Sequence, residues 1–138
     1  DQTIRLWDAQ SGTLSAIFEG HYGEVISTLW SPGGEILCSG TMEETIHLWD
    51  VQSGELRQTL EGYYGNNETI AWSPDGQWIA FSSNRDDRAR IDIWIMDRNG
   101  NHMQKISSGD THCWGPSFSP DGLAITFGQG GDGYTIDI

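Results

Sequence analysis

The chain is poor in basic residues, in cysteine and in long apolar runs, and each shortage argues against a class of protein. Lys and Arg number 7 against 20 Asp and Glu, a formal net charge of −13 at pH 7, so most of the surface would repel a phosphate backbone or an anionic membrane. The two cysteines, Cys38 and Cys113, form no CxxC or framework spacing, which predicts neither a disulfide-stapled miniprotein nor a structural zinc site. No apolar run approaches the roughly 20 residues that span a bilayer. We therefore expect no nucleic-acid or membrane partner, no metal and no cofactor.

An internal repeat organises the sequence. The phrase TIRLWDAQSG at residues 3–12 returns as TIHLWDVQSG at residues 45–54. A second phrase, WSPGGEIL at residues 30–37, returns as WSPDGQWIAF at 72–81 and as FSPDGLAITF at 118–127. Both phrases recur with a period of a little over forty residues, which indicates a propeller blade or a solenoid unit.

Each full unit reads as four short strands. The runs are rich in Ile, Leu, Val, Trp and Thr, they are bounded by Gly, Pro, Asn and Asp, and no window holds the spacing of an amphipathic helix. Ser-Pro-Asp-Gly is a tight-turn sequence, because Pro fixes φ near −65° and Gly tolerates positive φ. With residues 24–60 as the type unit, strands a, b, c and d are predicted at Val25–Trp30, Glu35–Ser39, Thr45–Trp49 and Leu56–Leu60.

The first half of the chain resembles a WD repeat. The resemblance is carried by the segment EGHYGEV (residues 19–25) and the LWSPGG and LCSGTMEETIHLWDVQSGE runs that follow it. These contain the Gly-His pair, the Ser-Gly after strand b and the Trp-Asp that closes strand c. In that family a His, a Ser, an Asp and the Trp form a structural hydrogen-bond tetrad. The resemblance implies that His21, Ser39 and Trp49 take these roles here, with Glu43 at the position of the Asp.

The second half resembles the TolB-like propeller repeat. The segment AWSPDGQWIAFSSNRDDRARIDIWIMDRNGNHMQKIS, residues 71–107, has the SPDG turn, the Ile-Ala-Phe strand, the Ser-x-Arg turn and the Ile-x-x-Met strand of that family. Together the two resemblances cover nearly the whole chain. They imply an all-β fold of propeller blades, each of four antiparallel strands, with about three blade equivalents in the chain.

The strand count predicts that the ring is not closed by these residues alone. Residues 3–18 read as strands c and d of a split blade, 24–60 and 68–107 as two full blades, and 113–138 as strands a, b and c of an incomplete blade. Propellers have about four or more blades, and unpaired sheet edges invite aggregation. We therefore expect either a homo-oligomer that completes the propeller ring, with six blades in a dimer or nine in a trimer, or a part of a larger propeller.

Loop lengths point to one edge of the blades as the binding edge. Because strands alternate in direction, the b to c and d to a loops share an edge, and the b to c loops differ in length between repeats while the a to b turns do not. Variable loops on a regular scaffold commonly carry binding, and aromatic residues beside Arg suit protein or peptide contacts; the alternative is that these are solvated loops. The candidate contact residues on this edge are Tyr22, Tyr63, Tyr64, Asn66, Arg85, Asp86, Arg88, His112 and Trp114.

Three patterns resemble catalytic or ligand motifs and are better explained by structure. His21, Ser39 and Glu43 are the residue types of a Ser-His-acid triad, but no nucleophile elbow or oxyanion motif accompanies them. The G-x-G-x-x-G at residues 128–133 precedes a predicted strand, Tyr134–Ile138, and not a helix, which indicates a hairpin loop. Residues 97–102 begin like a calcium loop but have His at the sixth position, where Gly is required. We predict no catalytic residues.

The tryptophans fit packing between neighbouring blades. Trp7 and Trp49 share the closing position of strand c, and Trp94 is predicted to hold that position in the later repeat. Large rings that recur once per blade are most simply explained as inter-blade contacts.

These observations favour a non-catalytic scaffold that binds proteins or peptides, as the WD resemblance implies. The alternatives are an accessory propeller of a peptidase or transport system, as TolB-like repeats imply, and a sugar-binding propeller. The chain is not expected to be an enzyme. No pattern names a compartment, and a cytoplasmic location is favoured.

Overall fold

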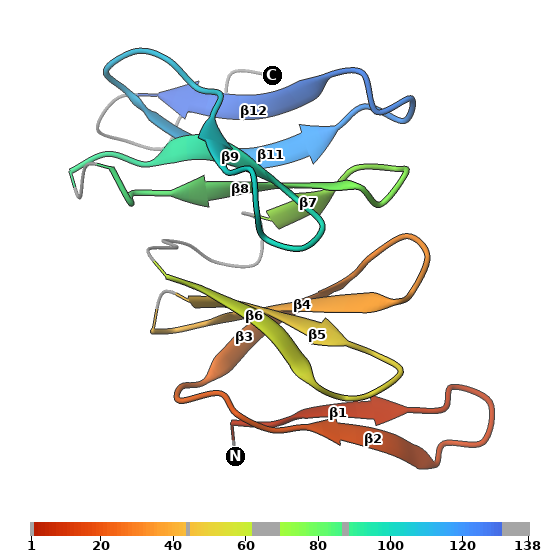
Figure 1. Cartoon of the computed structure of the whole chain (residues 1–138). Helices are drawn as coiled ribbons and strands as arrows, with labels where there is room; N and C mark the ends of the chain where they lie inside the picture. The colour runs from red at the N-terminus through yellow and green to blue at the C-terminus, as the bar shows by residue number, and fades with distance from the viewer. Residues whose placement is uncertain (1, 44, 62–69, 87–88, 131–138) are drawn as a thin grey trace.

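The protein is a row of twisted antiparallel sheets stacked face to face (Figure 1). The structure, a computed structural model, describes residues 2–43, 45–61, 70–86 and 89–130. Strands are the only regular elements in these ranges, which therefore hold no helix that could cross a membrane. The predicted all-β fold of four-stranded antiparallel blades is confirmed.

Four sheets follow one another along the chain, and each is a meander of sequential strands. They are the first hairpin, β1 (Ile4–Trp7) and β2 (Leu14–Phe18); blade 2, β3 (Val25–Trp30), β4 (Ile36–Thr41), β5 (Thr45–Asp50) and β6 (Leu56–Glu61); blade 3, β7 (Ile70–Trp72), β8 (Trp78–Ser83), β9 (Asp92–Asp97) and β10 (Gln104–Lys105); and the last hairpin, β11 (His112–Phe118) and β12 (Ile125–Gly130). In the two blades the strands lie in the order a, b, c, d. The described residues form no closed ring, and the strand predicted at Tyr134–Ile138 lies outside them.

The hydrophobic core lies between the sheets. One cluster joins the facing surfaces of blades 2 and 3, with Ile36, Ile46 and Leu48 on one side and Ile79 and Met96 on the other. A second cluster joins the first hairpin to blade 2. It consists of Phe18, Leu37 and Trp49, with Ile4, Leu6, Ala16 and Val51 packed against it. The first hairpin and the two blades are thus held together mainly by burying apolar surface between them.

The a to b turns have the same construction in all three repeats. In each turn the Ser hydroxyl accepts a hydrogen bond from the backbone N–H two residues after the Gly. Ser31 accepts this bond from Ile36 at 3.0 Å, and Ser73 and Ser119 accept it from Trp78 and Ala124 at 2.9 Å. The turn glycines Gly34, Gly76 and Gly122 have φ of +78°, +67° and +74°, a conformation that side-chain-bearing residues rarely adopt. Neighbouring turns also touch, because a Cβ on Gly76 would lie 3.4 Å from Cδ of Pro32, and one on Gly122 would lie 3.5 Å from Cδ of Pro74.

The register of blade 3 corrects one sequence prediction. Trp49 pairs with Leu37 in blade 2, and the equivalent of Leu37 in blade 3 is Ile79, which pairs with Met96. Met96 therefore holds the position of Trp49. Trp94 lies opposite Phe81, where blade 2 has His47 opposite Ser39, so the prediction that Trp94 repeats the Trp49 position is wrong.

Candidate functional site

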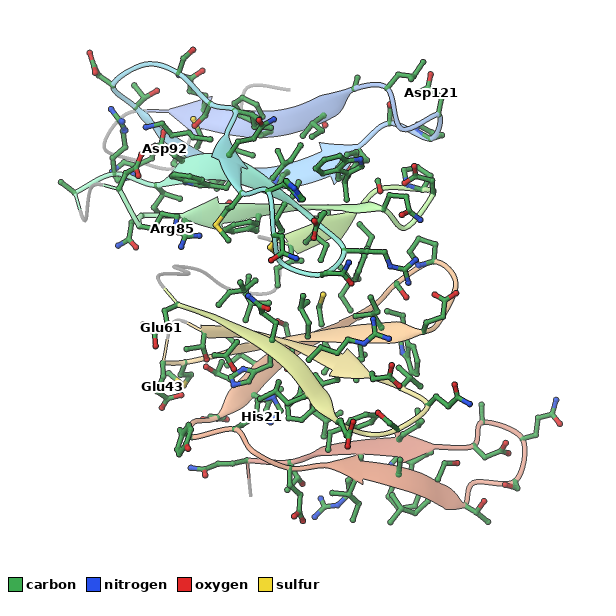
Figure 2. All side chains as sticks on the ribbon, in the orientation of Figure 1. His21, Glu43, Glu61, Arg85, Asp92 and Asp121 are labelled. Atoms are coloured by element: carbon green, nitrogen blue, oxygen red, sulfur yellow. The ribbon has the colours of Figure 1, made fainter. Side chains whose placement is uncertain are left out.

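The loops gather at two opposite edges of the stack. Figure 2 shows the labelled Glu43, Glu61, Arg85 and Asp92 toward one edge and Asp121, in the last a to b turn, at the other. The first edge is formed by the b to c and d to a loops, and we call it the variable edge. Between strands b and c the loop of blade 3, from Ser83 to Asp92, is much longer than the Thr41 to Thr45 turn of blade 2. The variable edge is thus where the blades differ.

A buried hydrogen-bonded cluster lies just below this edge in blade 2. Ser39 Oγ is 2.8 Å from Nε2 of His21 and accepts a hydrogen bond of 2.8 Å from Nε1 of Trp49. Ser39 is fully buried. Strands β4 and β5 supply Ser39 and Trp49, and the loop before β3 supplies His21, so the cluster ties that loop to the middle of the blade. Three of the four residues assigned by the WD resemblance are therefore in direct contact.

Glu43 does not complete this cluster. It is exposed in the turn between β4 and β5, and its carboxylate lies against the backbone of Gly23. Nδ1 of His21, the atom that the tetrad acid would face, is buried without a hydrogen-bond partner among the described residues. The turn from β4 to β5 thus carries its carboxylate outward, and the buried His ring is left with one anchored nitrogen.

A second histidine extends the cluster in a way that the sequence motifs did not signal. His47 lies opposite Ser39 in the β4–β5 pairing and is buried. Its ring is 4.7 Å from the His21 ring and stacks on Trp49 at 5.8 Å between centroids. Burial lowers the pKa of both histidines, and the proximity of His21 lowers the pKa of His47 further. The two rings are therefore held neutral, as part of the core.

In blade 3 a charged network braces the variable edge from below. Asp92, the first residue of β9, is buried; its Oδ1 accepts a hydrogen bond of 2.8 Å from Ser107, and its Oδ2 lies 3.2 Å from Nε of Arg90 and 3.5 Å from Nζ of Lys105. Burial would raise the pKa of Asp92, but the hydrogen bonds from Ser107 and Arg90 and the charge of Lys105 outweigh it, so the pKa is lowered. Lys105 also pairs with Asp86 at 3.0 Å. Asp92 and Lys105 thus join both ends of the long loop to the blade.

The same loop presents Arg85 on the blade surface. Its guanidinium lies over the Trp94 ring at 5.4 Å from the centroid and contacts the sulfur of Met103. Such a cation–π contact pre-orders a long side chain that would otherwise be free to move. Arg85, Asp86, Trp94 and Met103 together make a mixed aromatic, thioether and charged patch, which we call the Arg85 patch.

His112 and Trp114 connect blade 3 to the last hairpin. Nδ1 of His112 accepts a hydrogen bond of 3.1 Å from the Ile91 N–H, and the His112 and Trp114 rings are 6.2 Å apart. Both side chains are half-buried. Cys113 between them is buried, and burial raises the pKa of its thiol, so the unreactive protonated form is favoured. These two predicted contact residues therefore act first in positioning β11.

The edge of blade 2 is the most exposed part of the candidate site. Tyr22 is 92% exposed and Met42 is 64% exposed, and their loops are joined by a hydrogen bond of 3.0 Å from the Met42 N–H to the Glu24 carbonyl. Sequence reasoning found Tyr22 but missed Met42, although its place in the variable b to c turn was a usable signal. It also missed the network of Asp92, Ser107 and Lys105, because nothing in the letters shows which carboxylate will be buried.

Four of the predicted contact residues lie outside the described residues: Tyr63, Tyr64, Asn66 and Arg88. Among the residues that the structure does describe, no group of three or more His, Cys, Asp or Glu side chains is arranged to hold a metal ion. The Ser39–His21 pair has the contact of a nucleophile and its base, yet Ser39 is sealed from solvent and also accepts from Trp49. Its chemistry is that of a structural hydrogen bond.

Comparison with known proteins agrees with this geometry. Short segments of the chain are similar to two curated WD-repeat proteins: coronin-7 from Rattus norvegicus, 44% identical over 39 residues, and ribosome assembly protein 4 from Chaetomium thermophilum, 46% identical over 37 residues. These segments are 28% and 27% of this chain but only 4% and 7% of those proteins. The family model of the TolB beta propeller domain, in contrast, matches residues 2–137. The stacked four-stranded sheets and this match along nearly the whole sequence lead to one conclusion: the chain belongs to the TolB beta propeller domain family.

Proposed function

We propose that this chain is a non-catalytic scaffold that binds a protein or a peptide at its variable edge. The observation that carries the proposal is the pairing of exposed and pre-ordered contact residues there: Tyr22 and Met42 on blade 2, and the Arg85 patch on blade 3. Tyr, Met, Trp and Arg are the residue types enriched where proteins bind one another. The burial of Ser39 and the protonated, buried thiols of Cys38 and Cys113 argue against covalent catalysis.

The net charge of the chain restricts the class of ligand that we propose. A net charge of −13 repels acidic partners over long range. The Arg85 guanidinium is held over Trp94 and offers a local contact for a carboxylate within a mainly basic or neutral peptide. The proposed ligand is thus a peptide segment with basic and aromatic residues. Its basic residues are attracted to the acidic surface, and it binds to the Arg85 patch and Tyr22.

Selection from a random peptide library tests this proposal. Selected peptides are expected to bind the wild-type chain and to lose about tenfold in affinity for Tyr22→Ala or Arg85→Ala, the loss typical of an interface hot spot. Gln52→Ala, an exposed change in a c to d turn at the opposite edge, serves as the matched control and is expected to bind normally. Failure to select any peptide, or equal losses for Gln52→Ala, would overturn the proposal.

Self-association is the second part of the proposal. Among the described residues, the first hairpin supplies strands c and d of a blade and the last hairpin supplies strands a and b, so the two are complementary. A homo-oligomer completes the ring by joining them. Light scattering on the purified chain measures this directly, and a mass near twice 15.3 kDa is expected for a dimer.

A second candidate, an accessory propeller of a peptidase or transport system, is favoured by the TolB family match. The flanking sequence in the gene separates the two. A neighbouring hydrolase domain with a Gly-x-Ser-x-Gly elbow would support the accessory role, and signalling or assembly domains would support the scaffold.

A further inference from the structure

An apolar groove lies between blade 3 and the last hairpin. Its volume is about 460 Å³, and its walls include Ile95 and Ile106 from blade 3 and Phe118, Ile125 and Phe127 from the last hairpin. The groove opens beside β12, whose only partner among the described strands is β11. It is therefore an apolar surface next to a strand edge that pairs with no further described strand.

The repeat identifies what such a groove holds elsewhere in the molecule. The equivalent contact between the first hairpin and blade 2 is the cluster around Trp49, in which Leu6, Phe18 and Leu37 are among the neighbours of the ring. Leu6 lies opposite Ala16, as Ile95 lies opposite Gln104. Phe18 lies opposite Ile4, and in the same way the backbone N–H of Ile106 donates a hydrogen bond to the Ile93 carbonyl. Leu37 and Ile125 hold the same position after the Ser-Pro turn.

Ile95, Ile106 and Ile125 are thus the equivalents of Leu6, Phe18 and Leu37, three of the residues that surround Trp49. In blade 2 the ring that fills this space comes from strand c, paired with Leu37 on strand b. The groove is therefore shaped for a strand c aromatic ring paired with Ile125 on β12.

Trp7 is a strand c tryptophan without such a setting. It lies opposite Leu14 with a register shift between Leu6 and Trp7, just as Trp49 lies opposite Leu56 with a shift between Leu48 and Trp49. The two residues are equivalent, yet Trp49 is 1% exposed and Trp7 is 55% exposed. Strand β1 pairs with β2 alone among the described strands.

We propose that β1 of one copy pairs with β12 of a second copy and places Trp7 in the apolar groove. This proposal deepens the self-association part of the proposed function and rests on it. The composite blade has the order β11, β12, then β1 and β2 of the other copy, so β1 takes the strand c position that sequence patterns also predict for Tyr134–Ile138, which lies outside the described residues. Its register follows that of blade 2, where Ile36 is opposite Asp50, Leu37 is opposite Trp49 and Ser39 is opposite His47. In the composite blade, Ala124 is therefore opposite Asp8, Ile125 is opposite Trp7 and Phe127 is opposite Arg5.

The geometry of the stack favours a second copy as the occupant. β1 and β12 lie at opposite ends of the row of sheets, so one chain cannot join them in this arrangement (Figure 1). Two copies give six blades, within the usual range of four to eight. The strands that meet are almost uncharged, since β12 is ITFGQG and β1 is IRLW, so the acidic surface is kept away from the joint.

Light scattering with matched variants tests the anchor. Trp7→Ala and Ile125→Asp are each expected to weaken the dimer by at least about tenfold, while Trp30→Ala, which removes another exposed tryptophan away from the groove, leaves it intact. If the parent chain is a dimer that neither groove variant affects, the docking proposal is overturned and self-association stands. If the parent chain is a monomer, both are overturned, and peptide binding at the variable edge remains to be judged by its own assay.

Disulfide trapping tests the register. A mixture of Asp8→Cys chains and Ala124→Cys chains is expected to give a linked dimer on mild oxidation, because these positions are directly opposite. The matched control pairs Arg5→Cys with Ala124→Cys, three residues out of register, and is expected to give little of it. The native cysteines are buried and do not compete. Equal linking of both mixtures, or no linking in either mixture, would overturn the proposal.

Discussion

Blades 2 and 3 have the same strand order and pairing but are held to their preceding sheets by different chemistry. On the face of blade 2 toward the first hairpin, Ser39 and His47 lie opposite each other below Trp49, and hydrogen bonds join Ser39 to His21 and Trp49. In blade 3 the two positions opposite each other are Phe81 and Trp94. The backbone therefore accepts either directional polar contacts or apolar rings at the same place.

The difference also moves the polar anchor of the blade. In blade 2 the anchor is buried in the middle of the sheet at Ser39, whereas in blade 3 it is Asp92, at the end of β9 beside the variable edge. Blade 3 thus holds the loop that presents Arg85, whereas blade 2 anchors the loop before β3 through His21 and leaves the side chains of Tyr22 and Met42 exposed.

The largest loss of stability is expected for Trp49→Ala. Trp49 is almost fully buried between two sheets and donates to Ser39, so the change should lower the free energy of unfolding by about 3 to 5 kcal/mol. Denaturant melts measure this loss. Trp30→Ala is the control, since Trp30 is 44% exposed. An unchanged midpoint for Trp49→Ala would show that the first hairpin does not pack on blade 2.

Asp92→Asn removes the anchor of blade 3. The change leaves Arg90 and Lys105 without a buried carboxylate, and a loss of about 1 to 3 kcal/mol in the free energy of unfolding is expected from charge-assisted hydrogen bonds of this kind. Asp86→Asn touches only the exposed pair with Lys105 and should cost less than about 1 kcal/mol. Equal effects of the two changes would mean that burial gives Asp92 no special role.

The two anchors should respond to acid in separate pH windows. His21 and His47 have pKa values below their usual 6.5, so their contribution is complete above pH 6.5 and is lost as the pH falls below it, because the unfolded chain then binds protons that the folded chain refuses. The Asp92 contribution is complete above its unfolded pKa of 3.8 and is lost as the pH falls through its lower folded pKa.

Unfolding midpoints at a series of pH values measure this separation. His47→Gln should flatten the decline below pH 6.5 and leave the loss at lower pH, to which Asp92 contributes. A decline below pH 6.5 that persists unchanged in His47→Gln would exclude the histidine pair as its main cause.

The smallest effect is expected where the two blades meet in solvent. Nη2 of Arg98 in blade 3 lies 3.5 Å from the Glu35 carboxylate in blade 2, and Glu35 is well exposed. Arg98→Ala should change the free energy of unfolding by less than about 1 kcal/mol, with the difference shrinking further in high salt. A larger cost would show that this ion pair, and not the apolar cluster alone, sets the angle between the blades.

Sequence patterns predicted the strands well where local chemistry decides. Val25–Trp30 was predicted as it is found, and the three Ser-Pro turns are where their residues require them. The contact of His21, Ser39 and Trp49 follows from a motif with a fixed geometry. The position of Trp94 did not follow, because pattern matching gave weight to the visible Trp, whereas the register is fixed by the length of the Asp97–Gly100 turn and by the pairing with β8.

The candidate site was harder to predict than the fold. Asp92 is one of many acids in an acidic chain, and only the folded positions of Ser107, Arg90 and Lys105 distinguish it. The outward path of Glu43 likewise depends on the shape of a short turn and not on residue type. The amino-acid sequence alone therefore predicts poorly the position of a side chain that is set by the path of a loop.

The contacts between successive Ser-Pro turns set the spacing between neighbouring sheets at one edge of the stack. Each turn proline rests on the glycine of the next turn, Pro32 on Gly76 and Pro74 on Gly122, so one edge of the stack advances by a fixed step while the other edge varies freely. A blade can therefore lengthen its b to c loop, as blade 3 does, without changing the angle at which the following blade is added. Extended around a closed dimer, the same step would bring Pro120 of one copy onto Gly34 of the other.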